Sequence, residues 1–104
     1  MKPYVDHEKE IIRNFRNNPE LAAAYLNEVL ADGDQAELMT ALRRVALASG
    51  GVQAVAEASS LNPTSLYRTL SPRGNPELRS FLTILKSLGM TIRIIPMESN
   101  ARSA

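Results

Sequence analysis

Hydrogen-bonding side chains are concentrated in the segment LNPTSLYRTLS, residues 61–71. When Leu66 and Leu70 face inward on a short helix, the outward positions of that helix carry hydrogen-bond donors and acceptors. They are Asn62, Thr64, Ser65, Tyr67, Arg68 and Ser71. Arg forms paired hydrogen bonds with guanine in the major groove of DNA, and Asn forms them with adenine. The segment therefore predicts a DNA-reading helix, with Arg68 as the best candidate for sequence specificity. Its hydroxyl groups taken alone are better explained by solvation.

Three further side chains lie where contacts with DNA phosphates are expected. Gln53 begins the preceding helix, and Arg73 and Asn75 follow the second helix in a loop. Side-chain amides, guanidinium groups and backbone N–H groups all bind phosphate oxygens, which orients a protein on the duplex.

Two short helices separated by a brief turn must position these side chains. Their spacing is that of a helix-turn-helix, in which a small residue such as Ala56 lets the helices cross closely. Ser60 stands at the turn position that glycine usually fills, where serine adopts the required conformation at some cost. The inward residues are Val52, Val55 and Ala56 on the first helix and Leu66 and Leu70 on the second, with Leu61 in the turn.

Capping signals predict further helices on both sides of this pair. Asn-Pro pairs at 18–19, 62–63 and 75–76 are typical helix starts, and Asp34 with Glu37 has the spacing of a capping box. Apolar residues then recur at helical spacing over residues 19–30, 35–49 and 76–88. Residues 1–18 have a thin apolar stripe and are interpreted as a flexible N-terminal extension. The domain is expected over residues 19–96 and a disordered tail over 97–104.

The apolar pattern changes after residue 89. MTIRIIP alternates, is rich in β-branched residues and ends at a proline, which predicts one strand over residues 91–95. A lone strand needs a partner in the chain, in a second copy or in another protein. Ile92, Arg93 and Ile94 are accordingly candidate dimerisation residues. The expected fold is all-α, a compact bundle of five helices with this short C-terminal strand.

Composition limits the function classes. No cysteine and one histidine are present, and no glycine-rich phosphate loop is seen, so an enzyme, a metal site and a cofactor are not expected. No apolar run is long enough for a membrane span, and the cytoplasm is the default location. Residues 1–40 contain four Lys or Arg and eight Asp or Glu, a balance of −4, whereas residues 41–104 contain eight and three, a balance of +5. The basic part suits DNA phosphates.

A family resemblance covers the chain from about residue 24 to residue 96. It is carried by AYLNEVLADGD and ELMTALRRVALASGGVQAVAEASSLNPTSLYRTLSPRGNPELRSFLTILKSLGM, in which LYRTLS and GNP are the most diagnostic pieces. With these residues the chain resembles the Xre-type helix-turn-helix antitoxins called probable addiction module antidote proteins, relatives of the HigA antitoxins. The resemblance implies a lambda-repressor-like homodimer that binds operator DNA, represses its own operon and neutralises a RelE/ParE-like toxin. The family's recognition helix corresponds to residues 62–71.

The acidic N-terminal third is the expected docking surface for such a toxin, because toxins of this class are small and basic. The first candidates are Glu20, Glu28, Asp32 and Glu37. Two other hypotheses stay open: a module that binds only protein, and a stand-alone phage-type repressor without a toxin. A toxin-like neighbouring reading frame of basic composition distinguishes the antitoxin from the repressor.

Overall fold

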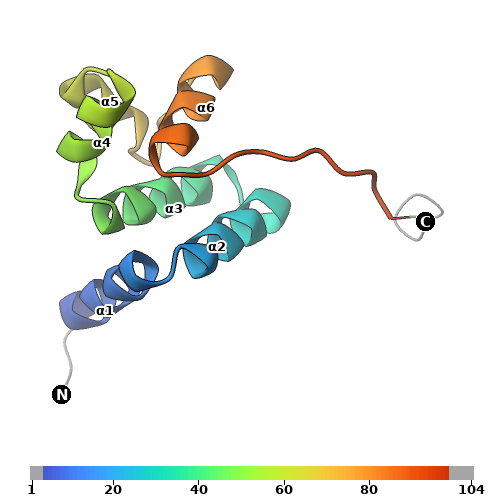
Figure 1. Cartoon of the computed structure of the whole chain (residues 1–104), viewed down its shortest axis with the longest axis horizontal. Coiled ribbons are helices and arrows are strands. Elements are labelled where there is room, and N and C mark those ends of the chain that lie inside the picture. Colours follow the sequence, from blue (N-terminus) through green and yellow to red (C-terminus); the bar gives the residue numbers. More distant parts are fainter. Residues whose placement is uncertain (1–3, 99–104) are drawn as a thin grey trace.

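The structure is a computed structural model that describes residues 4–98. Figure 1 shows a purely helical arrangement over these residues, with no strand in the described range. The expectation of five helices and a C-terminal strand is therefore wrong on both counts. The elements are α1 (Tyr4–Asn17), α2 (Pro19–Asp32), α3 (Gln35–Ala48), α4 (Val52–Ser59), α5 (Pro63–Thr69) and α6 (Leu78–Ser87).

Three of the four predicted helix starts, those of α2, α3 and α5, have the expected caps. The Oδ1 atom of Asn18 accepts a hydrogen bond from the Leu21 N–H at 3.1 Å, and Pro19 opens α2. Asp34 and Glu37 form a reciprocal capping box at the start of α3, with N–H to oxygen distances of 2.8 and 3.1 Å. Local hydrogen bonding thus fixes where these helices begin.

The predicted start of α6 at the third Asn-Pro pair is wrong. The helix begins two residues later, at Leu78, and Glu77 precedes it without a side-chain cap. The Oδ1 atom of Asn75 instead accepts a hydrogen bond from the Nε2 of Gln35 at 3.4 Å. The side-chain oxygen of Asn75 is therefore used in a tertiary contact with α3 and does not cap α6.

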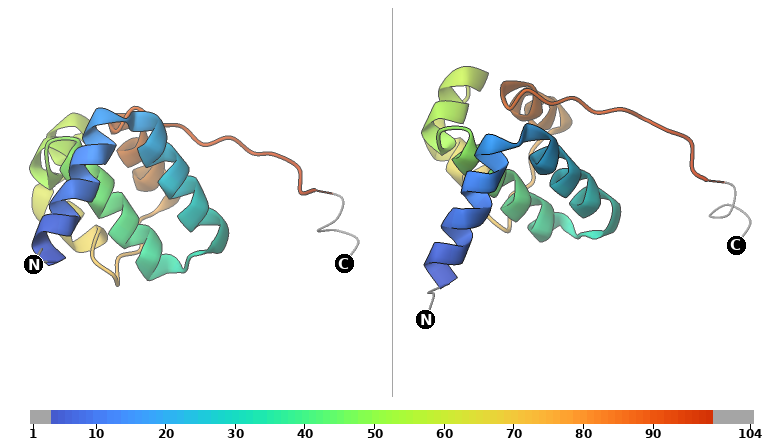
Figure 2. Two further views of the ribbon diagram at one scale, coloured as in Figure 1. Left: turned by 90° about the horizontal axis from the view of Figure 1, so that it is seen from below. Right: turned by 60° about the horizontal axis from the view of Figure 1, so that its bottom comes forward.

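Helix α1 supplies the helix that the predicted count lacked. It packs on α3 and α2, as the views in Figure 2 show, and buries Phe15. The ring of Phe15 stacks on Tyr25 with a centroid separation of 5.0 Å. Ile11 and Ile12 pack against the same core. The apolar stripe is thin, but the buried aromatic ring in the last turn of α1 helps to anchor the helix on the core.

A polar contact fastens α1 to α3 beside this aromatic pair. Arg44 donates from Nε and Nη2 to the carboxylate of Glu8 at 2.8 and 3.2 Å, and from Nη1 to the Tyr25 hydroxyl at 2.9 Å. These bonds raise the pKa of the Arg44 guanidinium further above its usual value. The forked guanidinium therefore joins the first three helices at one point.

Residues 91–98 leave the end of α6 and run extended, away from the helices (Figure 1). A strand requires a second extended segment as its hydrogen-bonding partner, and the rest of residues 4–98 is helices and short connections. This explains why the alternating pattern forms no strand within one copy. Of the predicted tail, residues 99–104 lie outside the described residues, as do residues 1–3 of the predicted extension.

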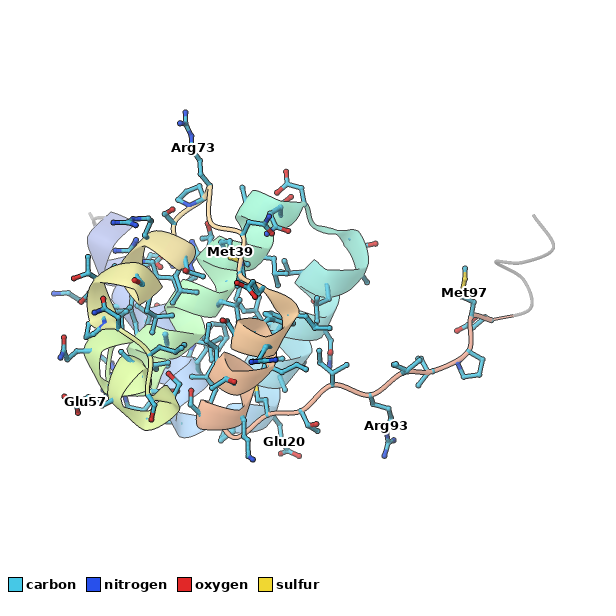
Figure 3. All side chains as sticks on the ribbon, turned by 90° about the horizontal axis from the view of Figure 1, so that it is seen from above. Glu20, Met39, Glu57, Arg73, Arg93 and Met97 are labelled. Atoms are coloured by element: carbon cyan, nitrogen blue, oxygen red, sulfur yellow. The ribbon has the colours of Figure 1, made fainter. Side chains whose placement is uncertain are left out.

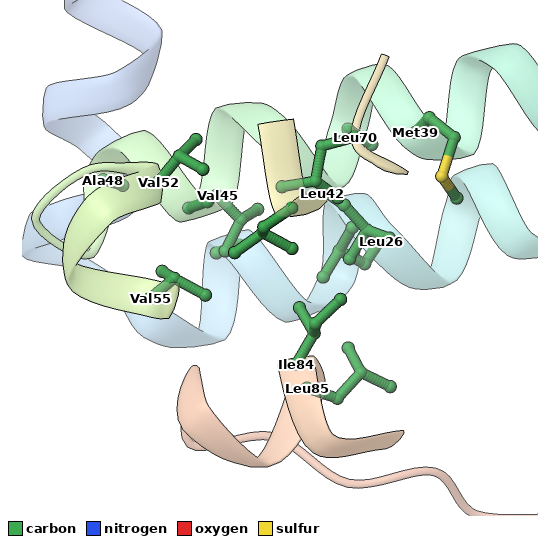
Figure 4. Packing of buried hydrophobic residues seen from close by; sticks show 14 of the residues in the cluster. Leu26, Met39, Leu42, Val45, Ala48, Val52, Val55, Leu70, Ile84 and Leu85 are labelled. Atoms are coloured by element: carbon green, nitrogen blue, oxygen red, sulfur yellow. The ribbon is translucent and has the colours of Figure 1, made fainter. Parts of the chain in front are cut away.

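Helix α3 lies at the centre of the core. It packs against α1 and α2 on one side and α4 on the other, and α4 in turn contacts α5 and α6. Figure 4 shows Leu42 and Val45 of α3 above Leu26 of α2 and Ile84 of α6. The largest side chains that are almost completely buried are Met39, Leu42, Val45, Val52, Leu66, Leu70 and Ile84.

The apolar stripe that the sequence predicts for α6 is confirmed in part. Its members are Leu78, Phe81, Leu82, Leu85 and Leu88. Leu85 is buried and Phe81 and Leu88 pack against the core, but Leu78 and Leu82 are exposed and the stripe omits the completely buried Ile84. Leucine is common enough on protein surfaces that a leucine-rich pattern does not fix the exact buried face of a helix. In residues 4–98, no helix has the length and apolar character needed to cross a membrane.

Replacing Arg44 with methionine is expected to lower the free energy of unfolding by about 1 kcal/mol, because Glu8 and Tyr25 lose their common donor in a partly exposed setting. Amide hydrogen exchange of the backbone of residues 4–17 should be faster in this variant than in the parent. Urea denaturation measures the loss, and Arg43→Met, an exposed substitution on the same helix, should cost less than about 0.5 kcal/mol. Equal losses in the two variants would contradict the anchoring role.

Candidate nucleic-acid interface

The turn between α4 and α5 has the geometry that the sequence predicted. Ser60 has φ 59° and ψ 35°, the left-handed conformation that glycine usually adopts. The Leu61 N–H then donates to the Ala56 carbonyl at 2.9 Å, which closes the end of α4. Ala56 is completely buried, so the small side chain predicted for the helix crossing is confirmed as a core residue.

The inward side of α5 is confirmed as well. Leu66 and Leu70 are 2% and 1% exposed, and they hold this seven-residue helix on the core. A helix this short is not stable alone in water, so its position depends on these two leucines. Burial of this side leaves the opposite side of α5 facing outward.

The outward side of α5 carries the predicted polar residues. Tyr67 is 47% exposed, and Thr64, Ser65 and Arg68 are exposed with no side-chain hydrogen bond to the described part of the chain. Their donors and acceptors are thus available to a ligand. Gln53, in the first turn of α4, is exposed in the same way.

Two other candidates on this segment have internal partners. The Oδ1 atom of Asn62 accepts from the Ser65 N–H at 3.0 Å and caps α5. The Ser71 hydroxyl donates to the Arg68 carbonyl at 2.7 Å. Sequence reasoning counted both as ligand-facing, but each also completes the backbone hydrogen bonding of the helix ends.

The loop after α5 is held against α3 by a residue that the sequence did not single out. Gln35 donates from Nε2 to the Gly74 carbonyl at 3.1 Å as well as to Asn75. No local pattern could have revealed this bond, because its partners are 39 and 40 residues apart. Arg73 extends from this loop away from the helices, as Figure 3 shows.

Gly74 is fixed in this loop by close packing. A Cβ atom at this position would overlap the backbone carbonyl of Thr69 at the end of α5. Only a residue without a side chain permits this approach, so Gly74 sets the path on which Arg73 leaves the helix.

Three of the four acidic candidates for a protein partner meet at one corner of the molecule. Glu28 and Asp32 of α2 and Glu37 of α3 line a hollow of about 250 Å³ beside Tyr25. Glu37 also belongs to the capping box of α3. Glu20 lies in the first turn of α2, about 12 Å along the helix axis from Glu28, and is not part of this hollow.

The candidate dimerisation residues lie on the extended segment after α6. Ile92 is 41% exposed, Ile94 is 93% exposed and Arg93 is exposed. Within the described range, 4–98, no group of three or more His, Cys, Asp or Glu side chains is arranged to hold a metal ion.

Fold and surface together define a small all-helical protein organised around a helix-turn-helix pair. A family model described as "Probable addiction module antidote protein" matches residues 7–96. The chain belongs to the probable addiction module antidote protein family. The family description is that of an antidote, the antitoxin of an addiction module, and not of an enzyme. Comparison with curated proteins and comparison with solved structures each give no match.

Replacing Gly74 with alanine is expected to lower the free energy of unfolding by about 2 kcal/mol or more, because the added carbon meets backbone that cannot move freely. Thermal or urea denaturation measures this. Arg73→Ala changes an exposed neighbour in the same loop and should leave stability within about 0.5 kcal/mol of the parent. A Gly74→Ala protein of parental stability would show that the loop is not packed as described.

Proposed function

We propose that this protein is an antitoxin that binds operator DNA as a twofold dimer, represses its own operon and neutralises a RelE/ParE-like toxin. The observation that carries the DNA-binding part is the exposed polar side of α5. Thr64, Ser65, Tyr67 and Arg68 lie there, on a helix whose other side is anchored by buried leucines. Family membership supports the antitoxin part.

In this proposal α5 enters the major groove and α4 lies across the phosphate backbone. Arg68 reads a guanine through paired hydrogen bonds. Gln53 and Arg73 contact phosphates on either side, and Asn75 supports the loop that carries Arg73. Two recognition helices related by the dimer axis then fit successive major grooves about 34 Å apart, so the operator is nearly palindromic.

Arg68 and Arg73 are expected to contribute to DNA binding in different ways. Arg68→Ala should weaken binding to the DNA upstream of the protein's own reading frame by about 1–3 kcal/mol and leave binding to scrambled DNA nearly unchanged. Arg73→Ala should weaken binding to both duplexes. It should also reduce the slope of log K against log salt concentration by about one, the amount expected for the loss of one phosphate contact. Mobility-shift titrations at several salt concentrations measure these effects.

Arg13→Ala provides the control for charge alone, because Arg13 is an exposed cation on α1 rather than on the helix pair. It should change binding to both duplexes only slightly. If Arg68→Ala loses as much affinity on scrambled DNA as on the operator, as is expected of Arg73→Ala, the assigned division between base and phosphate contacts is wrong.

The toxin part of the proposal uses the acidic hollow between α2 and α3. A small basic toxin would be attracted to Glu28 and Asp32, whose carboxylates are exposed and have no internal ion pair within the described residues. Glu37 shares the hollow but also caps α3, so its substitution would alter folding as well as charge.

Charge reversal at these two carboxylates is expected to lower the affinity for the product of the adjacent reading frame by about tenfold or more, chiefly through slower association. The test compares Glu28→Lys/Asp32→Lys with Glu57→Lys, which reverses an exposed carboxylate on α4 (Figure 3). Surface plasmon resonance measures the association and dissociation rates of each variant. Equal effects from α2 and α4 would mean that net charge, not this hollow, controls binding.

A further inference from the structure

The extended segment 91–98, here called the arm, exposes large apolar side chains beyond the end of α6. Ile94 and Ile95 are 93% and 71% exposed, and Met97 is 65% exposed. Figure 1 and Figure 2 both show the arm leaving the molecule at the end opposite α4 and α5. A row of large apolar residues on a projecting segment is costly in water unless another surface covers it.

An apolar groove of about 530 Å³ lies where the arm begins. Its walls come from α2, from the end of α6 and from the first residues of the arm. The apolar lining consists of Ala23, Leu26, Leu30, Leu85, Met90, Ile92 and Ile95. Arg93 is the charged residue among the lining side chains, and no carboxylate lines the groove. Its chemistry therefore suits an apolar segment that carries a negative charge.

We propose that two copies of this chain exchange arms, so that the arm of each copy lies in the groove between α2 and α6 of the other. The end of the arm, residues 94–98, has the composition that the groove requires, because it combines Ile94 and Met97, which do not line the groove of their own copy, with the acidic Glu98. Glu98 complements the Arg93 that lines the groove. A basic protein would find no carboxylate there and would meet Arg93 instead, so charge favours a second copy over a toxin.

The reach of the arm fits an exchange. Eight extended residues span about 26 Å, enough to cross from one body to the next. Because the arm leaves the end of the molecule away from α4 and α5, the exchange leaves the polar side of α5 uncovered. The proposal rests on the twofold dimer of the proposed function and supplies its contact surface.

The test is the oligomeric state of the full chain, measured by sedimentation equilibrium over a wide range of concentrations. Ile94→Asp changes the arm and Leu30→Asp changes the groove, and each should raise the dimer dissociation constant about thirtyfold or more. Leu47→Asp changes a comparably exposed leucine on α3, outside the groove lining, and should leave the constant near that of the parent. Circular dichroism checks that every variant is folded.

Mixing the two variants gives a sharper test. Ile94→Asp keeps an intact groove and Leu30→Asp keeps an intact arm, so a mixed dimer retains one of its two exchanged contacts. Association in the mixture that neither variant shows alone supports the exchange. A parent chain that stays monomeric, or variants that dimerise as the parent does, would overturn it.

Measuring the binding of each variant to a duplex with a single half-site tests the arm exchange and the proposed DNA binding independently of each other. Ile94→Asp should keep half-site binding while losing the dimer, since the arm lies away from α5. A parent that dimerises through its arm but binds no DNA would contradict repression and leave the exchange intact. A monomeric parent whose binding to the adjacent gene product depends on Ile94 would assign the arm to that protein and overturn the exchange.

Discussion

Burial of Leu66 and Leu70 is the constraint on which the rest of this structure depends. Helix α5 has only seven residues and cannot hold its shape in water without them. The two leucines reach a core centred on α3, and this contact alone decides which side of α5 meets solvent. The capped start of the helix and the left-handed turn at Ser60 then set its direction. Orientation of the polar residues is therefore mainly a result of packing, to which the polar side chain of Asn62 adds only the cap at the start of the helix.

The parts of the fold that follow from local rules were predictable from the sequence. The capping box at Asp34, the cap at Asn18 and the inward positions of the helix pair depend on neighbours within a few residues. Helix α1 was missed because its stability comes from Phe15 on Tyr25 and Glu8 on Arg44, contacts between distant segments. The predicted strand is absent for the opposite reason, since its favourable local pattern finds no extended pairing partner among residues 4–98.

Among the nine candidate DNA contacts, the structure separates exposed groups from those that also hold the scaffold. Asn62, Ser71 and Asn75 use side-chain oxygens on their own chain, whereas Tyr67 and Arg68 do not. Sequence reasoning placed these residues on the outward side of the helix pair but, apart from the helix start at Asn62, did not make this distinction, because a polar side chain looks the same in the sequence whether it contacts solvent or backbone. Gln35 was not predicted to have a role for a related reason, because its hydrogen-bond partner lies in a loop 39 residues away in the sequence.

The close approach of Gly74 to Thr69 changes how the tripeptide GNP should be understood. Gly74 is needed because a side chain at this position would overlap the backbone of Thr69. Asn75 accepts a hydrogen bond from Gln35, and Pro76 lies half-buried beside Leu38 and Phe81. All three hold the path of the chain itself. A tripeptide on which a family resemblance rests can thus reflect a steric requirement of the backbone and not a ligand contact. Differences in ligand choice are then to be sought at neighbouring positions that no backbone atom constrains.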